Sequence, residues 1–535
     1  MAETVKKIPR AGCPEEVGVS SKVVLDFINE MEDAGIELHS FIVMRHGKVA
    51  AECYRKPFDR DIPHQMYSVS KSFTSTAVGF AIEEGLISLD TSVVEIFPDY
   101  LEGEYDERLD RITVRTLLNM TAGKSPKLLS DKGKIDWIED FLAAPYYAEP
   151  GEKFRYTNEN IYMLCAILFR VTGMCVRDYL EPRLFKPLGI AYPFWETDQK
   201  GIEAGGWGIY VKTEDFAKLM LCYAQDGVFE GKQVIPAQWT RAATAPQANS
   251  DVCTCLDSSN GYGYCFWMNG GCPDSYRADG MFSQFGLVFK EYDAVFICTG
   301  GNACEQDARD YIWQYFPKAF DDSLTEQDTL KDFAERMHDY PIDRPALSPR
   351  STREIMIDGR TIKVRKKILL NLIGFPMSVI PLAVTYMMTE KSGNIDNICL
   401  NFDDEACQMF WTEGKYSNSV SCGMDGHFRY GNIKLCGIDF RVCCNAEWLD
   451  NDNLQVTIRP VETVAKRMLK FRFKNSDRVN IYPSSTPDVK SIALVLSGSI
   501  LELLGDNMVG RVAQFAMLKV VPSIVEPVHR GRILK

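Results

Sequence analysis

Residues 67–79, YSVSKSFTSTAVG, open an apolar run that is compatible with a helix, and they contain one S-x-x-K spacing, from Ser68 to Lys71. If the helix begins near Ser68, residues three apart lie on one face, so the hydroxyl and the amine point at the same small volume. A serine there also lies near unpaired backbone N–H groups and the positive end of the helix dipole, which stabilise an oxyanion. The same residues also fit a simple helix cap, so other parts of the chain must decide.

The length and composition indicate a soluble globular protein of two domains. A chain of 535 residues exceeds what one hydrophobic core usually supports. Its 46% hydrophobic and 25% charged residues are ordinary for that class. The net charge of -13 argues against nucleic acid or an anionic membrane as the main partner, and it leaves a small neutral substrate open.

The N-terminus and the cysteines predict a cytoplasmic protein. Residues 1–10 carry some positive charge, but no apolar segment follows them, so we expect no signal peptide. The 17 cysteines include no C-x-x-C pair, which favours free thiols in a reducing compartment. The adjacent Cys443 and Cys444, and the C-x-C of Cys253 and Cys255, lack histidines at ligand spacing, so we expect no metal and no cofactor.

One segment, residues 368–389, is free of charge and long enough to span a membrane. It also contains Pro376 and Pro381, which fit buried strand and turn segments better than a single spanning helix. We therefore expect no membrane span.

The order of predicted elements indicates an α+β fold with antiparallel strands. Residues 20–33 have helical spacing behind a serine cap. Residues 39–44 and 49–54 flank a glycine-containing turn and predict a hairpin. The helix near Ser68 follows, and this rhythm differs from that of a doubly wound fold. Three later β-rich runs, 261–267, 276–289 and 294–299, predict adjacent strands of one sheet.

A change of composition predicts the domain boundary. Pro341, Pro345 and Pro349 lie among many charged residues, and we assign residues 1–325 to the first domain and 326–535 to the second. Short alternating runs continue to about residue 489 and predict an antiparallel β domain of unknown function. Residues 499–521 predict a final helix.

A nucleophilic serine needs a nearby base and donors for the oxyanion. The chain has no G-x-S-x-G motif, and His64, four residues before Ser68, is interpreted as a local structural or substrate-facing group. A lysine with a lowered pKa, or a tyrosinate beside it, is the other solution. Lys71 is one candidate; the other is Tyr156, on a loop that leads into a helical run over 161–171.

Three motifs together give a specific pattern. They are Ser68-x-x-Lys71, Tyr156-x-Asn158 and Ala278-Asp279-Gly280. This pattern resembles that of the penicillin-recognising serine hydrolases, above all the class C β-lactamase-like branch of esterases, D-stereospecific peptidases and 6-aminohexanoate-dimer hydrolases. Segments 14–18, 39–43, 112–118 and 187–190 resemble this branch too. The likeness covers about residues 10 to 320, and the C-terminal third lies outside it.

The resemblance implies a β-lactamase/transpeptidase-like domain, with a five-stranded antiparallel sheet beside a helical subdomain and the site between them. It implies that Ser68 forms an acyl-enzyme and that Lys71 assists its deprotonation. Tyr156 would be general base in acylation and acid toward the leaving group. Asn158 would bind the acyl side, and the backbone N–H groups of Ser68 and Met281 would form the oxyanion hole.

The strand motif departs from the family pattern. Lactam-binding members usually have Lys-Thr-Gly there, whereas this chain has Ala278 and Asp279 before Gly280. An anionic lactam would lose a cationic partner, so we expect poor lactam hydrolysis. Asp279 either makes a structural hydrogen bond or favours an amino-bearing substrate. Trp207, Trp267 and Phe282 either wall an apolar acyl pocket or belong to the core.

The sequence thus predicts a serine hydrolase that cleaves a small ester or amide through an acyl-enzyme. An acyltransferase with the same residues is the first alternative. A non-catalytic binding protein of the same fold is the second. The physiological substrate and the oligomeric state stay open.

Overall fold

The computed structural model describes residues 6–101, 103–125, 136–253, 256–272, 274–325, 330–338, 341–342, 345, 347–365, 395–413, 415–435, 438–491 and 508–534. Its contacts divide the chain into two units. The first unit comprises residues 1–55, 59–300 and 305–340, and the second comprises 56–58, 301–304 and 341–535.

This division lies later in the chain than the predicted boundary after residue 325. Helix α12 (Leu330–His338) belongs to the first unit because it packs on α1 (Ser21–Asp33). Phe333 joins the same core as α1, and Arg336 forms an ion pair with Glu32. The proline-rich segment therefore follows α12 and does not precede it.

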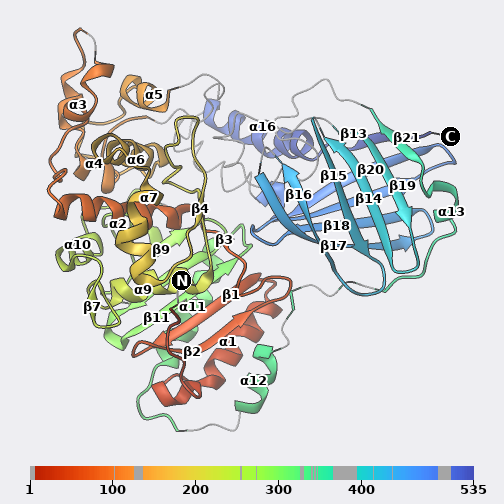
Figure 1. Ribbon diagram of the computed structural model, residues 1–535, viewed down its shortest axis with the longest axis horizontal. Helices are drawn as coiled ribbons and strands as arrows, with labels where there is room; N and C mark the ends of the chain where they lie inside the picture. Colours follow the sequence, from red (N-terminus) through yellow and green to blue (C-terminus); the bar gives the residue numbers. More distant parts are fainter. Residues whose placement is uncertain are drawn as a thin grey trace. The chain divides into compact units, whose positions relative to one another are not determined.

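An antiparallel sheet forms the centre of the first unit (Figure 1). The antiparallel sheet that the resemblance implies is confirmed, and the two-residue strand β8 adds a sixth strand at its edge through pairs such as Met268 with Tyr276. The strands, in spatial order, are β2 (Lys48–Tyr54), β1 (Leu38–Arg45), β11 (Ala294–Gly300), β10 (Gln284–Phe289), β9 (Tyr276–Gly280) and β8 (Trp267–Met268).

Both predicted elements at the N-terminal end of the first unit are confirmed. Helix α1 begins after Ser20, whose hydroxyl accepts a hydrogen bond from the N–H of Val23. Strands β1 and β2 form the predicted hairpin around His46 and Gly47, whose φ angles of 50° and 72° are those of a tight hairpin turn.

Helices cover both faces of this sheet. On one face, Phe27 of α1 packs on Phe296 of β11 and on Phe316 of α11 (Glu305–Ala319), with ring centroids 5.8 and 4.9 Å apart. On the other face lies α9 (Thr213–Ala224). There Gly286 of β10 lies so close to α9 that an added Cβ would come within 2.6 Å of the Phe216 ring. The small residue is therefore needed for this helix to reach the sheet.

The remaining helices of the first unit include α2 (Ser70–Glu83), which is buried on nearly all sides. Its hydroxyl-rich sequence fits this burial because the hydroxyls are hydrogen-bonded: Ser72 donates to the Cys265 carbonyl at 2.9 Å, and Ser75 donates to the Tyr264 carbonyl at 2.7 Å. The other helices are α3 (Val93–Ile96), α4 (Val114–Leu118), α5 (Trp137–Ala143), α6 (Asn158–Thr172), α7 (Val176–Leu180), α8 (Lys186–Leu188) and α10 (Ala237–Ala243).

Among the described residues, ten strands make up the sheet of the second unit, which confirms the predicted antiparallel β domain. Their alternation places residues such as Val456, Ile458 and Phe471 in one apolar core. In spatial order they are β15 (Tyr416–Gly423), β14 (Ala406–Glu413), β13 (Ile395–Phe402), β12 (Thr361–Val364), β21 (His529–Ile533), β20 (Arg478–Thr486), β19 (Lys466–Phe473), β18 (Asn453–Pro460), β17 (Ile438–Asp450) and β16 (Arg429–Leu435).

The two edges of this sheet meet. Strand β15 pairs in parallel with β17 through Gly423 and Asn445. The Asn418 side chain of β15 also accepts from the Lys434 N–H at 2.8 Å and donates to the Lys434 carbonyl at 3.2 Å. The sheet is therefore closed on itself. The unit also contains α13 (Glu354–Ile357) and α16 (Met508–Val525), and α16 overlaps the predicted final helix over 499–521 and continues beyond it.

No single helix of the described residues has the length and apolar character needed to cross a membrane. One sharply bent pair, Asn158–Thr172 with Val176–Leu188, meets these two criteria jointly. The charge-free segment 368–389 lies outside the described residues.

Candidate active site

The backbone before Ser68 is held by strand β5 (Ile209–Val211). The Met66 N–H donates to the Ile209 carbonyl at 3.0 Å, and Ser70 Oγ accepts from the Ile209 N–H at 3.1 Å. Tyr67 has a φ of 47°, which is rare for a bulky side chain and costs about 1–3 kcal/mol. Ser68 lies in a 3-10 turn over Tyr67–Val69, so α2 itself begins two residues later than predicted, at Ser70.

The structure brings Lys71 to Ser68. Lys71 Nζ lies 2.9 Å from Ser68 Oγ, 2.8 Å from Asn158 Oδ1 and 2.6 Å from the Gly206 carbonyl oxygen. Lys71 is only 1% exposed. This burial lowers the pKa of Lys71 to about 7, although the charges of Cys265, Glu159 and Asp279 oppose the shift. Near neutral pH a large share of the amine is therefore uncharged and able to accept a proton.

Tyr156 completes this cluster. Its hydroxyl is hydrogen-bonded to the Ser68 side chain, and Lys71 Nζ lies 4.7 Å from the centre of its ring. Trp267 packs on the same ring, with centroids 5.3 Å apart and planes inclined by 30°. Burial raises the pKa of Tyr156 well above 10, and the hydrogen bond to Ser68 only partly offsets this. The phenol is therefore neutral at physiological pH.

Asn158 and Gly206 belong to two segments that meet at Lys71. Asn158 is the first residue of α6, whose preceding residue Thr157 caps the helix by accepting from the Asn160 N–H. An added Cβ at Gly206 would lie 2.9 Å from Asn158 Oδ1, so the close approach requires glycine. The side chain of Asn158 is exposed apart from this contact.

Trp207 directly follows Gly206, and its indole is hydrogen-bonded to a residue outside the Ser68 cluster. Its Nε1 donates to Glu196 at 3.3 Å, and Trp207 is buried. Glu196 also accepts from Tyr210 and from Gln65, each at 3.3 Å. Burial raises the pKa of Glu196 to about 8. The sequence did not single out Glu196, which follows Trp195 and belongs to no motif.

The strand motif lies against Ser68, and its aspartate is paired. Asp279 Oδ2 accepts from Arg277 at 2.6 Å and from Arg309 at 3.2 Å. These contacts favour the structural interpretation of Asp279. An added Cβ at Gly280 would come within 2.3 Å of the Met66 carbonyl oxygen and 3.3 Å of the Ser68 nitrogen, so only glycine fits. Arg277 and Arg309 were not predicted.

Two further predicted residues follow the motif. Met281 is 39% exposed, and it opens the turn between β9 and β10. Phe282 is buried, and its ring packs edge-on against that of Tyr67 with centroids 5.2 Å apart. Phe282 therefore links the strand motif to the residue before Ser68.

His64 is a structural group, in line with one of its two predicted roles. Its Nε2 lies 2.9 Å from His39 Nδ1, and its Nδ1 lies 2.8 Å from the Gln65 carbonyl oxygen. Burial and the neighbouring His39 lower the pKa of His64 to about 3, so it is neutral at physiological pH. Both of its ring nitrogens are hydrogen-bonded to groups other than Ser68.

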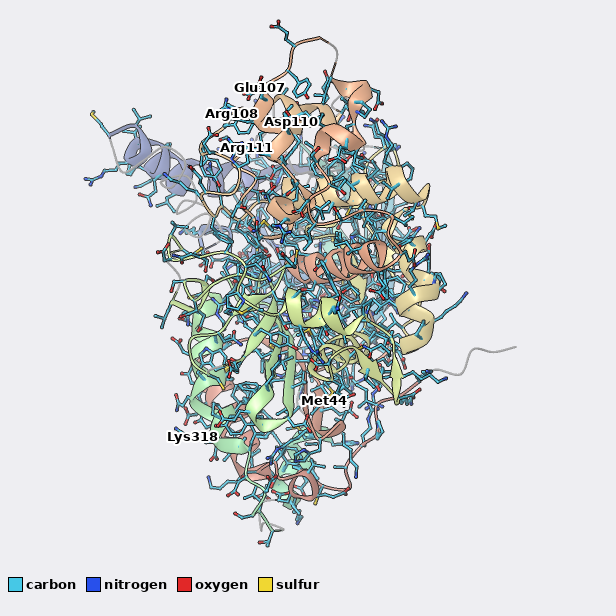
Figure 2. The ribbon with its side chains drawn as sticks, turned by 90° about the vertical axis from the view of Figure 1, so that its left-hand side faces the viewer. Met44, Glu107, Arg108, Asp110, Arg111 and Lys318 are labelled. Atoms are coloured by element: carbon cyan, nitrogen blue, oxygen red, sulfur yellow. The ribbon has the colours of Figure 1, made fainter. Side chains whose placement is uncertain are left out.

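Two hollows lie in the described part of the first unit. One, of about 410 Å³, is lined by several lysines that include Lys212 and Lys218, and these two are paired with Asp61 and Asp215. The other, of about 940 Å³, lies over residues 103–111. Figure 2 shows Glu107, Arg108, Asp110 and Arg111 of this loop close together at one end of the view. Neither hollow is lined by the Ser68 cluster. Within the described ranges, no three His, Cys, Asp or Glu side chains are placed to hold a metal ion.

Comparison with known proteins agrees with the family resemblance. The family model described as Beta-lactamase matches residues 27–302, more than half of the chain. The 6-aminohexanoate-dimer hydrolase of Paenarthrobacter ureafaciens is 27% identical over 225 residues, which are 38% of this chain and 57% of that protein. The monacolin J acid methylbutanoyltransferase of Aspergillus terreus is 29% identical over 168 residues, 27% of this chain and 40% of that protein.

The chain thus spans about half the length of these curated relatives. Among solved structures, the octameric penicillin-binding protein homologue from Pyrococcus abyssi aligns with a TM-score of 0.45 and 14% identity, over 86% of this chain and 97% of that one. From the extent of the family match, the chain belongs to the beta-lactamase family.

Proposed function

We propose that this protein is a serine hydrolase that cleaves a small ester or amide through an acyl-enzyme on Ser68. The observation that carries the proposal is the 2.9 Å distance between Lys71 Nζ and Ser68 Oγ in a buried site. A base within hydrogen-bond reach is what a serine nucleophile needs.

In the proposed acylation, uncharged Lys71 takes the proton from Ser68 Oγ while Oγ bonds to the substrate carbonyl carbon. The lowered pKa of Lys71 supports this role. The raised pKa of Tyr156 favours a neutral phenol, so Tyr156 acts as the acid that protonates the leaving oxygen or nitrogen. The Lys71 ammonium then returns a proton to Tyr156. This assignment gives the base role to Lys71 alone, whereas the resemblance gave it to Tyr156.

The oxyanion of the tetrahedral intermediate would be held by the N–H groups of Ser68 and Met281. The close approach of Gly280 to the Ser68 nitrogen supports this, since Met281 is the next residue. Water then attacks the acyl-enzyme carbonyl and gives a proton to Lys71, and the Lys71 ammonium returns this proton to Ser68 Oγ as the acyl–oxygen bond breaks. Asn158, which binds Lys71, lies at the proposed acyl side.

The proposed substrate lacks a carboxylate beside the scissile bond. Ala278 is fully buried where lactam-binding relatives carry a lysine, and Asp279 is paired with two arginines. No side chain of this motif thus offers a free cation to a lactam carboxylate. The printed name of the bacterial relative, a 6-aminohexanoate-dimer hydrolase, motivates linear amides as test substrates.

A labelling experiment tests the proposed reaction. Wild-type protein and Ser68→Ala are incubated with a fluorophosphonate probe and with p-nitrophenyl acetate. We expect covalent labelling and turnover for the wild type and neither for Ser68→Ala. Ser88→Ala, at an exposed serine of the same unit, is the control and should behave as wild type. An unlabelled wild type would favour the non-catalytic binding protein instead.

Two substrate assays refine the proposal. Nitrocefin should be hydrolysed at least about 10³-fold less efficiently than the best ester, and efficient hydrolysis would contradict the substrate argument. A relative named as a methylbutanoyltransferase motivates the second assay. Added alcohols or amines should give little ester or amide product if water is the acceptor, and dominant transfer would identify an acyltransferase.

A further inference from the structure

The turn that connects β9 to β10 has an unusual backbone. It consists of Met281, Phe282 and Ser283, and the last two have φ angles of 67° and 73°. Bulky or branched side chains seldom adopt this left-handed region, and such residues persist only where their surroundings hold them in place. The turn therefore needs partners outside its own backbone.

Two side chains supply these partners from opposite sides. Glu305 Oε1, at the start of α11, accepts a hydrogen bond from the Phe282 N–H at 2.9 Å. Gln284 Nε2 donates to the carbonyl oxygens of Met281 at 3.1 Å and Phe282 at 3.0 Å. Gln284 is fully buried and is also bonded to Gly300, so it is part of the sheet itself.

The same turn is fixed relative to the nucleophile segment. A Cβ added at Gly280, the residue just before the turn, would lie 3.3 Å from the Ser68 nitrogen. The Phe282 ring packs edge-on on the Tyr67 ring, and Tyr67 too has a positive φ of 47°. The two strained segments that would supply the oxyanion donors are thus in direct contact.

Apart from the Phe282 N–H, the Glu305 carboxylate also contacts an arginine. Its Oε2 lies 3.7 Å from Arg309 Nη1, and Arg309 is in turn 3.2 Å from Asp279 Oδ2. The Glu305 side chain is 26% exposed, so its removal leaves a small gap at the edge of the site and no void in the core. Gln284, by contrast, cannot be removed without loss of several buried hydrogen bonds.

We propose that Glu305 is a positioning residue for the second oxyanion donor: its hydrogen bond to Phe282 N–H holds the turn in the conformation that aims the Met281 N–H. The inference rests on the proposed function, since the oxyanion hole has a role only if Ser68 is acylated. Glu305 acts through the backbone, and it donates nothing to the substrate. An amide oxygen at this position serves equally well as acceptor.

Three variants of the full-length chain test this proposal. Glu305→Ala removes the acceptor, Glu305→Gln keeps it without the charge, and Asp307→Ala changes an exposed acid in the first turn of the same helix. With p-nitrophenyl acetate we expect Glu305→Ala to lower kcat about 10- to 100-fold with KM within about twofold, because a displaced donor acts on the transition state. Glu305→Gln should stay within about threefold of wild type, and Asp307→Ala should equal it.

Hydrogen exchange measures the turn without reference to catalysis. Amides of the peptide that contains Met281 and Phe282 should exchange at least about fivefold faster in Glu305→Ala than in the other two variants. Equal exchange in all proteins, or an unchanged kcat in Glu305→Ala, would overturn the proposal. An equal kcat loss in Glu305→Gln would also overturn it, since the charge would then matter and not the acceptor. Faster exchange together with an inactive wild type would refute the proposed function and support the structural role of Glu305.

Discussion

The two units of this chain differ in the polar groups that they bury. The first unit buries a hydroxyl-rich helix and titratable groups such as Lys71, Glu196 and His64. The second unit fills its closed sheet mainly with alternating apolar residues. Among described residues other than glycine, all those with positive φ, including Tyr67 and Phe282, lie in the first unit.

This difference bears on the proposed reaction, which we assign to the first unit. At Ser68, the positive φ of Tyr67 and the lowered pKa of Lys71 occur together, and the proposed reaction needs fixed donors and an uncharged amine. The sheet of the second unit follows regular alternation, and we expect its core residues to contribute to stability. Substitutions in the two units should therefore change different observables.

The largest effect is expected from Lys71→Met, which keeps the length of the side chain and removes the amine. We expect acylation to slow by about 10³- to 10⁴-fold, because the amine 2.9 Å from Ser68 Oγ is the proposed base. In the wild type, kcat/KM should fall tenfold per pH unit below about pH 7 as Lys71 becomes protonated. Stopped-flow rates and a pH series measure both.

Lys124→Met is the matched control for this variant. Lys124 is also buried, and burial lowers its pKa to about 8, but its amine donates to the carbonyls of Leu142 and Ala144. Its loss should lower stability and leave the acylation rate within about threefold. A loss for Lys71→Met below tenfold would remove Lys71 from the proposed mechanism.

Tyr156→Phe should slow acylation by about 10²- to 10⁴-fold, because it removes the acid for the leaving group and keeps the ring packed on Trp267. The loss should be greater for amides than for activated esters, whose leaving groups need less protonation. Tyr162→Phe, which removes a hydroxyl bonded to Asp198, is the control and should leave the rates unchanged. Equal losses for the two substrate classes would argue against the acid role.

In the second unit, Phe471→Ala should lower the free energy of unfolding by about 3–5 kcal/mol, because it leaves a cavity in a fully buried core. Chemical denaturation measures this change. Turnover per active site, titrated with the fluorophosphonate, should stay within about threefold of wild type. A larger fall in turnover would break the contrast between the two units.

Glu196→Gln should have the smallest effect on catalysis, because it changes only the pH dependence of stability. The folded-state pKa of about 8 exceeds the usual 4.5, so the folded protein binds more protons between these values. Stability from this group is complete below pH 4.5 and is lost as pH rises toward 8, by at most about 1.4 kcal/mol per pH unit. Glutamine imitates the protonated form, so the variant should lack this decline. Parallel curves for the two proteins would refute the assignment.

The sequence predicted local features well and distant partners poorly. The spacing of Ser68 and Lys71 was sufficient to foresee their contact, since both lie within one turn of chain. It did not reveal that the Gly206 carbonyl would bind Lys71, or that Arg309 would pair with Asp279. These contacts join segments far apart in the chain, and no periodicity records them.

A similar limit applies to the fold. Alternation predicted the strands of the second unit, yet nothing in the alternation indicated that the two edges would meet at Gly423 and Asn445. The 3-10 turn before α2 was also not foreseen, because it depends on hydrogen bonds from Ile209 of a distant strand. Tertiary contacts decide such details after propensity has decided the elements.

The closure of the second unit's sheet at those two edges bears on where the sheet opens first. Neighbouring antiparallel strands in this unit share ladders of three to eight residue pairs, whereas β15 and β17 share one pair among the described residues, helped by the Asn418 amide. The sheet is thus closed at one junction, between β15 and β17, that has few backbone pairs. Separation of β15 from β17 breaks the fewest backbone pairs among the described residues, so we expect sub-global unfolding of the second unit to start there.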